Sequence, residues 1–369
     1  MNVVVMNMKK ITEKIAVLLI ILLFLLCLTE PEIAGKAVYT AVQRCLETVI
    51  PSLYAVMTLS VIIIRSGVTS YVPRLVKLAA ERIFGMEGFV LPIFTFSMFA
   101  GYPVGTKMLV SEYDSGRLAK KRTELLCGMC YGAGPAFIFG CISGKLYGSQ
   151  KIGELILIST VSANLLLALF MSFFLRKSVD NSGEKGEFRL SANMLTECVI
   201  SGGRSVIEIC FMITAFAIIS EFIRTFGAAD FIGGITAKII NVPKETAASL
   251  VCAVLDVTDI SGLPCGDYTI LPYICGLVSF GGLCVIFQTA AAISGRFSII
   301  PLVIERLAAA VISGTICRLL IPYYFSYEAV LVSSVKIDAY NGYSPIPSIM
   351  LMIMTLLLFY RYGENNKNC

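Results

Sequence analysis

Several charged side chains stand inside apolar stretches of this sequence, close to two glycine-proline-glycine patterns. Asp256 and Asp259 precede the pattern GLPCG, and Lys107 follows the related pattern GYPVG by two residues. An ionisable group at membrane depth is expensive and by default indicates the handling of a substrate or an ion. We predict that Asp256 or Asp259 takes a coupling proton or sodium ion and that Lys107 binds a substrate anion. The alternatives are that Asp259 caps a helix and that the Lys107 side chain reaches to the membrane surface. Glu305 and Arg306, adjacent in a later apolar run, are expected to form a buried pair with a structural role.

The two Gly-x-Pro-x-Gly patterns can themselves form a binding site. Proline lacks a backbone N–H and glycine tolerates turns that other residues resist, so each pattern frees backbone groups from helical hydrogen bonds. In hydrocarbon those groups must face protein, water or a ligand, and free N–H groups at a helix start suit a carboxylate or another anion. Close packing of helices is the alternative. The predicted substrate-binding residues are Gly101, Pro103, Gly105, Lys107, Gly134, Gly262, Pro264, Gly266 and Gln288.

A glycine-rich segment follows each pattern. These segments are CYGAGPAFIFG at 130–140 and SFGGLCVIFQ at 279–288. We expect both to unwind and to line a cavity, with Gln288 and Asn164 as polar donors and acceptors. Contacts between helices through small residues are the competing interpretation.

The composition excludes a soluble globular protein and most familiar enzyme chemistries. Of 369 residues, 57% are hydrophobic and 15% are charged, and the mean hydropathy is +0.81. The chain has no histidine, which excludes Ser-His-Asp triads and histidine zinc sites. Cys127 and Cys130 form a C-x-x-C pattern without a second pair, so we expect no metal site. Since no nucleophile and base pair is visible either, we expect no cofactor and no enzyme activity. Basic residues are not interleaved with exposed aromatic residues, which argues against nucleic-acid binding.

Apolar runs of membrane-spanning length recur along the chain. The first run, 15–28, follows three lysines and is interpreted as a membrane anchor in preference to a cleaved signal peptide. Two other runs, 89–100 and 247–255, are too short to cross and are predicted to be re-entrant. The expected fold is all-α, a polytopic membrane protein with about eight transmembrane helices and two re-entrant helical hairpins. The predicted crossings are 15–28, 46–64, 125–144, 155–175, 205–223, 273–293, 299–321 and 346–360.

The two halves of the chain resemble each other and are predicted to be inverted relative to one another. GYPVG begins 36 residues after Arg65, and GLPCG begins 38 residues after Arg224. Basic clusters flank the first short run on both sides, which places both of its ends in the cytoplasm. The same rule, continued through the predicted crossings, places both chain termini in the cytoplasm as well. Four predicted crossings precede a polar linker, so the second repeat starts from the opposite face, as in many secondary transporters. The predicted units are an N-terminal anchor and loop at 1–44, a first repeat at 45–177, the linker at 178–190, a second repeat at 191–326 and an external loop with a last helix at 327–369.

The ordered motifs GYPVGTK, GAGPAFIFG and SFGGLCVIFQ resemble those of the YlbJ-type sporulation integral membrane proteins. The resemblance runs from about Cys45 to Ser326. It implies two nucleoside-recognition Gate domains, with a fold similar to that of concentrative nucleoside transporters. It also implies delivery of dipicolinic acid to the developing spore, across the outer forespore membrane.

Two hypotheses of different classes follow. The first is a membrane transporter for a small anionic or nucleoside-like solute, with alternating access at a midplane site between the two hairpins. The second is a non-transporting membrane scaffold or assembly factor for spore maturation, in which the broken helices are docking surfaces. The expected partners are a small-molecule solute and the lipid bilayer, and the formation of a homo-oligomer is left open.

Overall fold

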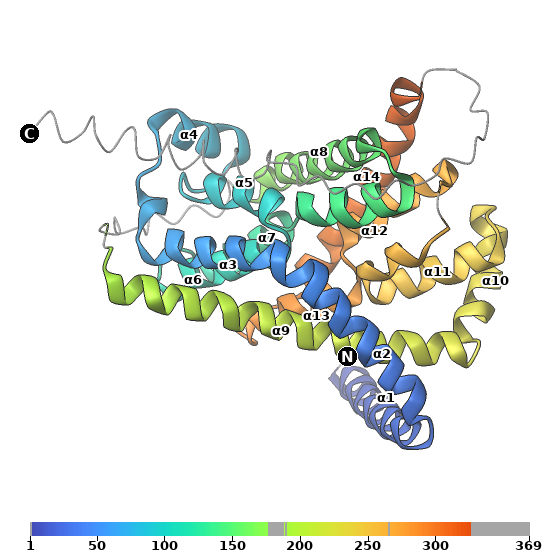
Figure 1. The fold of residues 1–369 in the computed structure, drawn as a ribbon. Helices are drawn as coiled ribbons and strands as arrows, with labels where there is room; N and C mark the ends of the chain where they lie inside the picture. Colours follow the sequence, from blue (N-terminus) through green and yellow to red (C-terminus); the bar gives the residue numbers. More distant parts are fainter. Residues whose placement is uncertain (1, 176–187, 189, 265, 326–369) are drawn as a thin grey trace, which may run out of the picture.

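The structure is a computed structural model that describes residues 2–175, 188, 190–264 and 266–325 (Figure 1). Every regular element within these ranges is a helix. The last predicted crossing at 346–360, the loop before it and most of the predicted linker lie outside the described residues.

Five helical stretches of the described chain are long and apolar enough to cross a membrane. A crossing needs about 20 consecutive apolar residues because a helix rises about 1.5 Å per residue. The expected all-α, polytopic class is therefore confirmed. The five stretches are Pro31–Arg65, Gln150–Leu175, Ala192–Thr225, Tyr268–Ile293 and Ile300–Tyr324.

The long helices pack in two groups. Helices α2 and α3 pack along α9, while α14 packs against both α8 and α12 (Figure 1). The elements used below are α1 Asn2–Thr29, α2 Pro31–Arg44, η1 Cys45–Val49, α3 Ile50–Arg65, α5 Val90–Ala100, α6 Val104–Asp114, α7 Lys120–Met129, η4 Ala136–Tyr147, α8 Gln150–Leu175, α9 Ala192–Thr225, α10 Ala228–Ile240, α11 Lys244–Leu255, η6 Val257–Gly262, η7 Tyr268–Ile270, α12 Leu271–Phe280, α13 Gly282–Ile293 and α14 Ile300–Tyr324. Three further short helices, η2 Val68–Ser70, α4 Arg74–Ala79 and η3 Ala80–Phe84, connect α3 to α5.

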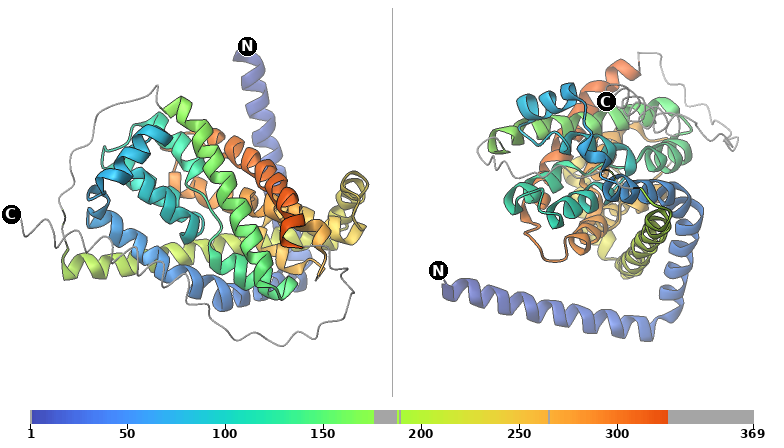
Figure 2. Two further views of the ribbon diagram at one scale, coloured as in Figure 1. Left: turned by 90° about the horizontal axis from the view of Figure 1, so that it is seen from above. Right: turned by 90° about the vertical axis from the view of Figure 1, so that its left-hand side faces the viewer.

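Helix α1 extends away from the rest of the fold (Figure 2). Its apolar side chains, among them Leu18, Ile20 and Phe24, are exposed. Its apolar part is shorter than the five spanning stretches. A helix with exposed apolar side chains gains stability from contact with lipid rather than from contact with the rest of the fold, as expected for the predicted anchor.

Two of the predicted crossings are interrupted helices. In 125–144, α7 ends at Met129 and η4 begins at Ala136, with Pro135 just before η4. In 273–293, α12 and α13 are separated at Gly281, where φ is +85°, and Gly282 also has a positive φ. Glycine reaches this left-handed region without the steric cost of a side chain. The unwinding expected in both glycine-rich segments is thus present.

The two short apolar runs form different structures. Helices α5 and α6 pack against each other around Gly101–Pro103, a helical hairpin at the predicted position. The second hairpin turns elsewhere: α10 packs on α11, and the chain turns at Asn241, which has a φ of +54°. After α11 the helix stops at Asp256, because its carboxylate Oδ1 accepts the Thr258 backbone N–H at 3.0 Å and competes with helix continuation. The predicted second turn at GLPCG is corrected accordingly.

Candidate functional site

The two helix interruptions are joined by one arginine. Arg306 on α14 is 0% exposed, and its Nη1 donates to the carbonyl oxygens of Tyr131 at 3.2 Å and Ser279 at 3.4 Å. Tyr131 belongs to the α7–η4 interruption, and Ser279 lies one residue before the end of α12. The same Nη1 donates to Asn164 Oδ1 at 2.9 Å, and Asn164 Nδ2 donates to the Tyr131 carbonyl at 2.9 Å. Arg306 and Asn164 thus satisfy backbone acceptors that an unbroken helix would have satisfied itself.

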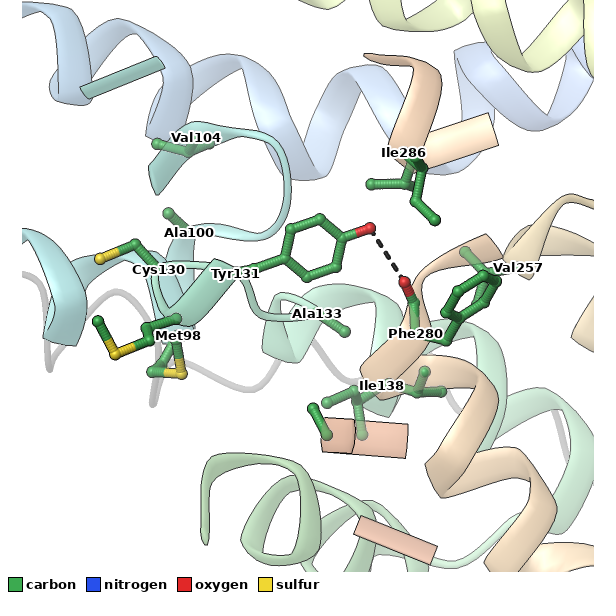
Figure 3. Packing of buried hydrophobic residues seen from close by; sticks show 14 of the residues in the cluster. Met98, Ala100, Val104, Cys130, Tyr131, Ala133, Ile138, Val257, Phe280 and Ile286 are labelled. Atoms are coloured by element: carbon green, nitrogen blue, oxygen red, sulfur yellow. Dashed lines mark hydrogen bonds between the residues drawn. The ribbon is translucent and has the colours of Figure 1, made fainter. Parts of the chain in front are cut away.

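Tyr131 forms a second link between the interruptions. Its hydroxyl donates to the Phe280 carbonyl oxygen at 3.1 Å (Figure 3). The Arg306 guanidinium lies 4.9 Å from the centre of the Tyr131 ring. The centre of the Tyr102 ring lies 5.0 Å from the centre of the Tyr131 ring. A methyl group at Gly281 would overlap the Tyr131 hydroxyl. The missing side chain at Gly281 therefore makes the space into which Tyr131 inserts.

The first predicted binding motif packs tightly on the α7–η4 interruption. A methyl group at Gly105 would overlap the Cys130 carbonyl oxygen and approach Ser97 Cβ at 2.6 Å. Gly101 and Gly134 face each other, and a methyl group added to Gly101 would lie 3.4 Å from the Gly134 nitrogen. Pro103 is also buried. These four predicted residues do converge, and the glycines allow backbones to approach each other closely.

The junction between the interruptions contains buried polar atoms that have no hydrogen-bond partner among the described residues. A buried polar atom without a partner costs about 1–3 kcal/mol, so these atoms are candidates for contact with a water, an ion or a ligand. At the junction the atoms concerned are Nε and Nη2 of Arg306 and the hydroxyl oxygens of Ser279 and Tyr102. Elsewhere in the buried core they include both carboxylate oxygens of Glu305, the hydroxyl oxygen of Thr106 and Oδ2 of Asp256.

Glu305 and Arg306 are both buried. The expected ion pair between them is not among the ion pairs that the described residues form. Adjacent residues on a helix point about 100° apart, so they reach different neighbours. Glu305 is 1% exposed and lies against Gly128 of α7, where a methyl group would overlap its carboxylate. Arg306 turns instead toward the interruptions.

A separate polar cluster involves the predicted ion-coupling residues. Asp259 Oδ1 lies 3.2 Å from Arg44 Nη1, and its Oδ2 accepts the Ser220 hydroxyl at 2.6 Å. Arg44 Nη1 also donates to Thr258 Oγ1 at 2.6 Å. Asp259 is therefore the partner of an arginine rather than a helix cap. Asp256 is 1% exposed and keeps Oδ2 without a partner among the described residues, so it matches the expected ion-coupling role better than Asp259 does.

A cavity of about 170 Å³ opens beside this cluster. It lies between the end of α2, η1, η4 and η6, and Arg44 and Lys145 are among its lining residues. Arg44 was not among the residues singled out from the sequence. Its signal was available, because it is an arginine within the apolar helical stretch Pro31–Arg65.

The remaining predicted residues lie outside the junction. Lys107 is 24% exposed, and its Nζ lies 3.3 Å from Oε2 of the exposed Glu208 on α9. Gln288 is buried and donates to Cys284 Sγ at 3.3 Å. In GLPCG, Gly262, Pro264 and Gly266 are exposed, and the Gly266 N–H donates to the Leu146 carbonyl at 3.0 Å. GLPCG therefore borders η4 and does not mirror the buried position of GYPVG.

Five helical stretches of membrane-spanning length, two interrupted helical segments and a buried arginine that joins the interruptions define a polytopic helical membrane protein with an internal polar junction. Its sequence is similar to that of the sporulation integral membrane protein YlbJ of Bacillus subtilis (strain 168). The two are 22% identical over 408 aligned positions, which cover 98% of this chain and 99% of the relative. No family model matches the chain, and no solved structure matches it. The similarity supports the expected sporulation family and the integral membrane character of the chain.

Proposed function

We propose that this chain is a membrane transporter that moves a small anionic or nucleoside-like solute by alternating access, with dipicolinic acid during spore formation as the first candidate. The observation that carries the proposal is the junction of two interrupted helices through Arg306 and Tyr131. Transporters commonly place their sites where interrupted helices meet, because the freed backbone groups then serve the solute.

The contacts at the junction suit a change between two states. Few hydrogen bonds join the interruptions, and all of those in the described part of the chain involve Arg306, Asn164 or the Tyr131 hydroxyl. When α12 and α13 move away from the α7–η4 interruption, these donors and the unpartnered atoms around them become available to a solute or to water. The present structure is then the closed state of the junction.

Asp256 is the proposed coupling residue. One of its oxygens holds the Thr258 N–H, and the other has no partner among the described residues. A buried carboxylate of this kind needs a proton or a cation to offset the loss of hydration. The resulting linkage would make solute movement depend on a proton or sodium gradient.

Uptake into proteoliposomes tests the transport function. We expect the purified full chain to accumulate radiolabelled dipicolinate or uridine and Asp256→Asn to lower the gradient-driven rate about tenfold or more, because the amide cannot change its charge. The matched control is Asp230→Asn, which removes an exposed carboxylate from α10. No uptake of either solute, or equal rates for Asp256→Asn and the control, would contradict the proposal.

The second candidate is a non-transporting scaffold for spore maturation. The tight packing at Gly105 and Gly281 favours it, since the space between the interruptions is filled by protein. A scaffold predicts that the purified chain retains a dedicated membrane partner and that a change at Gly281 releases this partner. Solute uptake by the chain alone would decide against it.

A further inference from the structure

Glu305 is a carboxyl group buried inside the spanning helix α14. Its exposed fraction is 1%, and neither of its two carboxyl oxygens has a hydrogen-bond partner among the described residues. Burying an ionised carboxylate without a partner costs far more than burying a neutral carboxylic acid. The surroundings of Glu305 therefore favour the protonated, uncharged form of its side chain.

The groups around Glu305 offer little to stabilise a negative charge. Within the described chain, the titratable groups that interact with it are Arg306 on the same helix, Cys127 on α7 and Cys130 just after α7, and the packed helices α8 and α12 add none. Both cysteines are buried, and a thiol in apolar surroundings stays neutral. Arg306 is the one cation of this set, but its Nη1 already donates to three oxygen acceptors at the junction.

Glu305 also lies beside the first helix interruption. Its side chain packs on Gly128, the residue before the last one of α7, and a methyl group there would overlap Oε2 and lie 2.9 Å from Cβ of Glu305. Glu124 stands one helical turn before Gly128 on α7, so this side adds a carboxylate and no cation. Any movement of the end of α7, or of Arg306, changes the contacts of Glu305 directly.

We propose that Glu305 is a proton-binding site that releases its proton when the two interruptions separate. Separation moves the Tyr131 and Ser279 carbonyl oxygens away from the Arg306 guanidinium, which stays charged and then needs another acceptor. The O–H bond of the Glu305 carboxyl group breaks, the proton passes to the water that enters, and the carboxylate becomes the counter-charge of Arg306. Closure of the junction reverses the step.

The proposal rests on the proposed transport function and deepens it. It adds a second coupling site to the one proposed at Asp256 and names the proton as the ion that this second site binds. An ionisable side chain inside a membrane protein that exchanges a proton is typical of pumps and transporters that use a proton gradient.

Infrared spectroscopy of the purified full chain tests the protonation state. A protonated carboxyl group gives a C=O stretching band of its own, and an isotopic label in the glutamate side chains shifts that band for glutamic acids but not for aspartic acids. We expect a label-sensitive band near neutral pH that Glu305→Gln removes. Glu112→Gln is the matched control and should keep the band, because Glu112 is also buried but lies 2.9 Å from Arg117 Nη1 in an ion pair.

The unfolding midpoint gives a second measurement that needs no transport. Glutamine has nearly the shape of a protonated glutamate and carries no charge, so Glu305→Gln should unfold close to the wild-type midpoint. If Glu305 were instead an ionised partner of Arg306, its loss would leave a buried cation without a counter-charge. Glu305→Gln would then lower the midpoint as much as Arg306→Met does, and this result would overturn the site.

Proteoliposomes test the coupling. We expect Glu305→Gln to lower the uptake of radiolabelled dipicolinate or uridine driven by a pH gradient about tenfold or more, because the amide cannot release a proton. Exchange of labelled for unlabelled solute without a gradient should continue, since it needs no net proton movement.

The outcomes separate the proton site from transport. A glutamic acid band that survives Glu305→Gln rejects the site, and gradient-driven uptake equal to that of the wild type rejects its role in coupling. If the wild type takes up neither solute, the transport function fails, while the infrared band and the unfolding midpoint still decide whether Glu305 holds a proton.

Discussion

Arg306→Met is expected to destabilise the chain by about 3–5 kcal/mol, the cost of removing one partner from a buried charged network. Methionine fills much of the same volume but donates no hydrogen bond. The carbonyl oxygens of Tyr131 and Ser279 and the amide oxygen of Asn164 would lose the Nη1 donor. A buried acceptor left without a donor costs about 1–3 kcal/mol. The measurement is the unfolding midpoint in a denaturing-detergent titration of the bicelle-reconstituted chain.

Arg318→Met on the same helix is the matched control, because Arg318 is exposed. It should change stability little. Arg306→Lys should lie between the wild type and Arg306→Met, since an ammonium group still donates but cannot copy the planar guanidinium. An equal effect of Arg306→Met and Arg318→Met would show that the two interruptions are stable without the arginine.

Gly105→Ala is expected to destabilise the chain by about 3 kcal/mol, near the upper end of the usual cost of overpacking. The new methyl group would overlap the Cys130 carbonyl oxygen and approach Ser97 Cβ at 2.6 Å. The first neighbour is backbone, so α6 or the α7–η4 interruption must move. We expect solute uptake to fall with stability, because the junction would no longer close.

Gly140→Ala provides the comparison at a helical glycine with open space. Apart from the local backbone of its own helix, no described atom lies within 4 Å of the position that the alanine methyl group would take, so alanine should be neutral or slightly stabilising there. The same titration and the same uptake assay apply to both variants. If Gly105→Ala behaves like Gly140→Ala, the close approach of α6 to Cys130 is not required for the fold.

Local sequence predicted some features correctly because their causes are local. The glycines at 281–282 and the segment around Pro135 favour an interruption, because glycine costs a helix about 1 kcal/mol and proline about 3 kcal/mol relative to alanine. The first hairpin turn at Gly101–Pro103 follows from the same property. At GLPCG the identical pattern was misleading, since Asp256 ends the helix earlier by accepting the Thr258 N–H. The pattern indicates that a helix must stop near it, and a neighbouring side chain decides where.

The sequence by itself determined that this is an all-helical membrane protein with interrupted helices, because apolar run length and backbone restriction act over a few residues. Only the tertiary structure decided which polar groups meet. Arg44 and Asp259 are 215 positions apart, and Arg306 and Tyr131 are 175 apart. Contacts over such separations depend on how whole helices pack, and the spacing of residue types along the chain does not encode that packing directly.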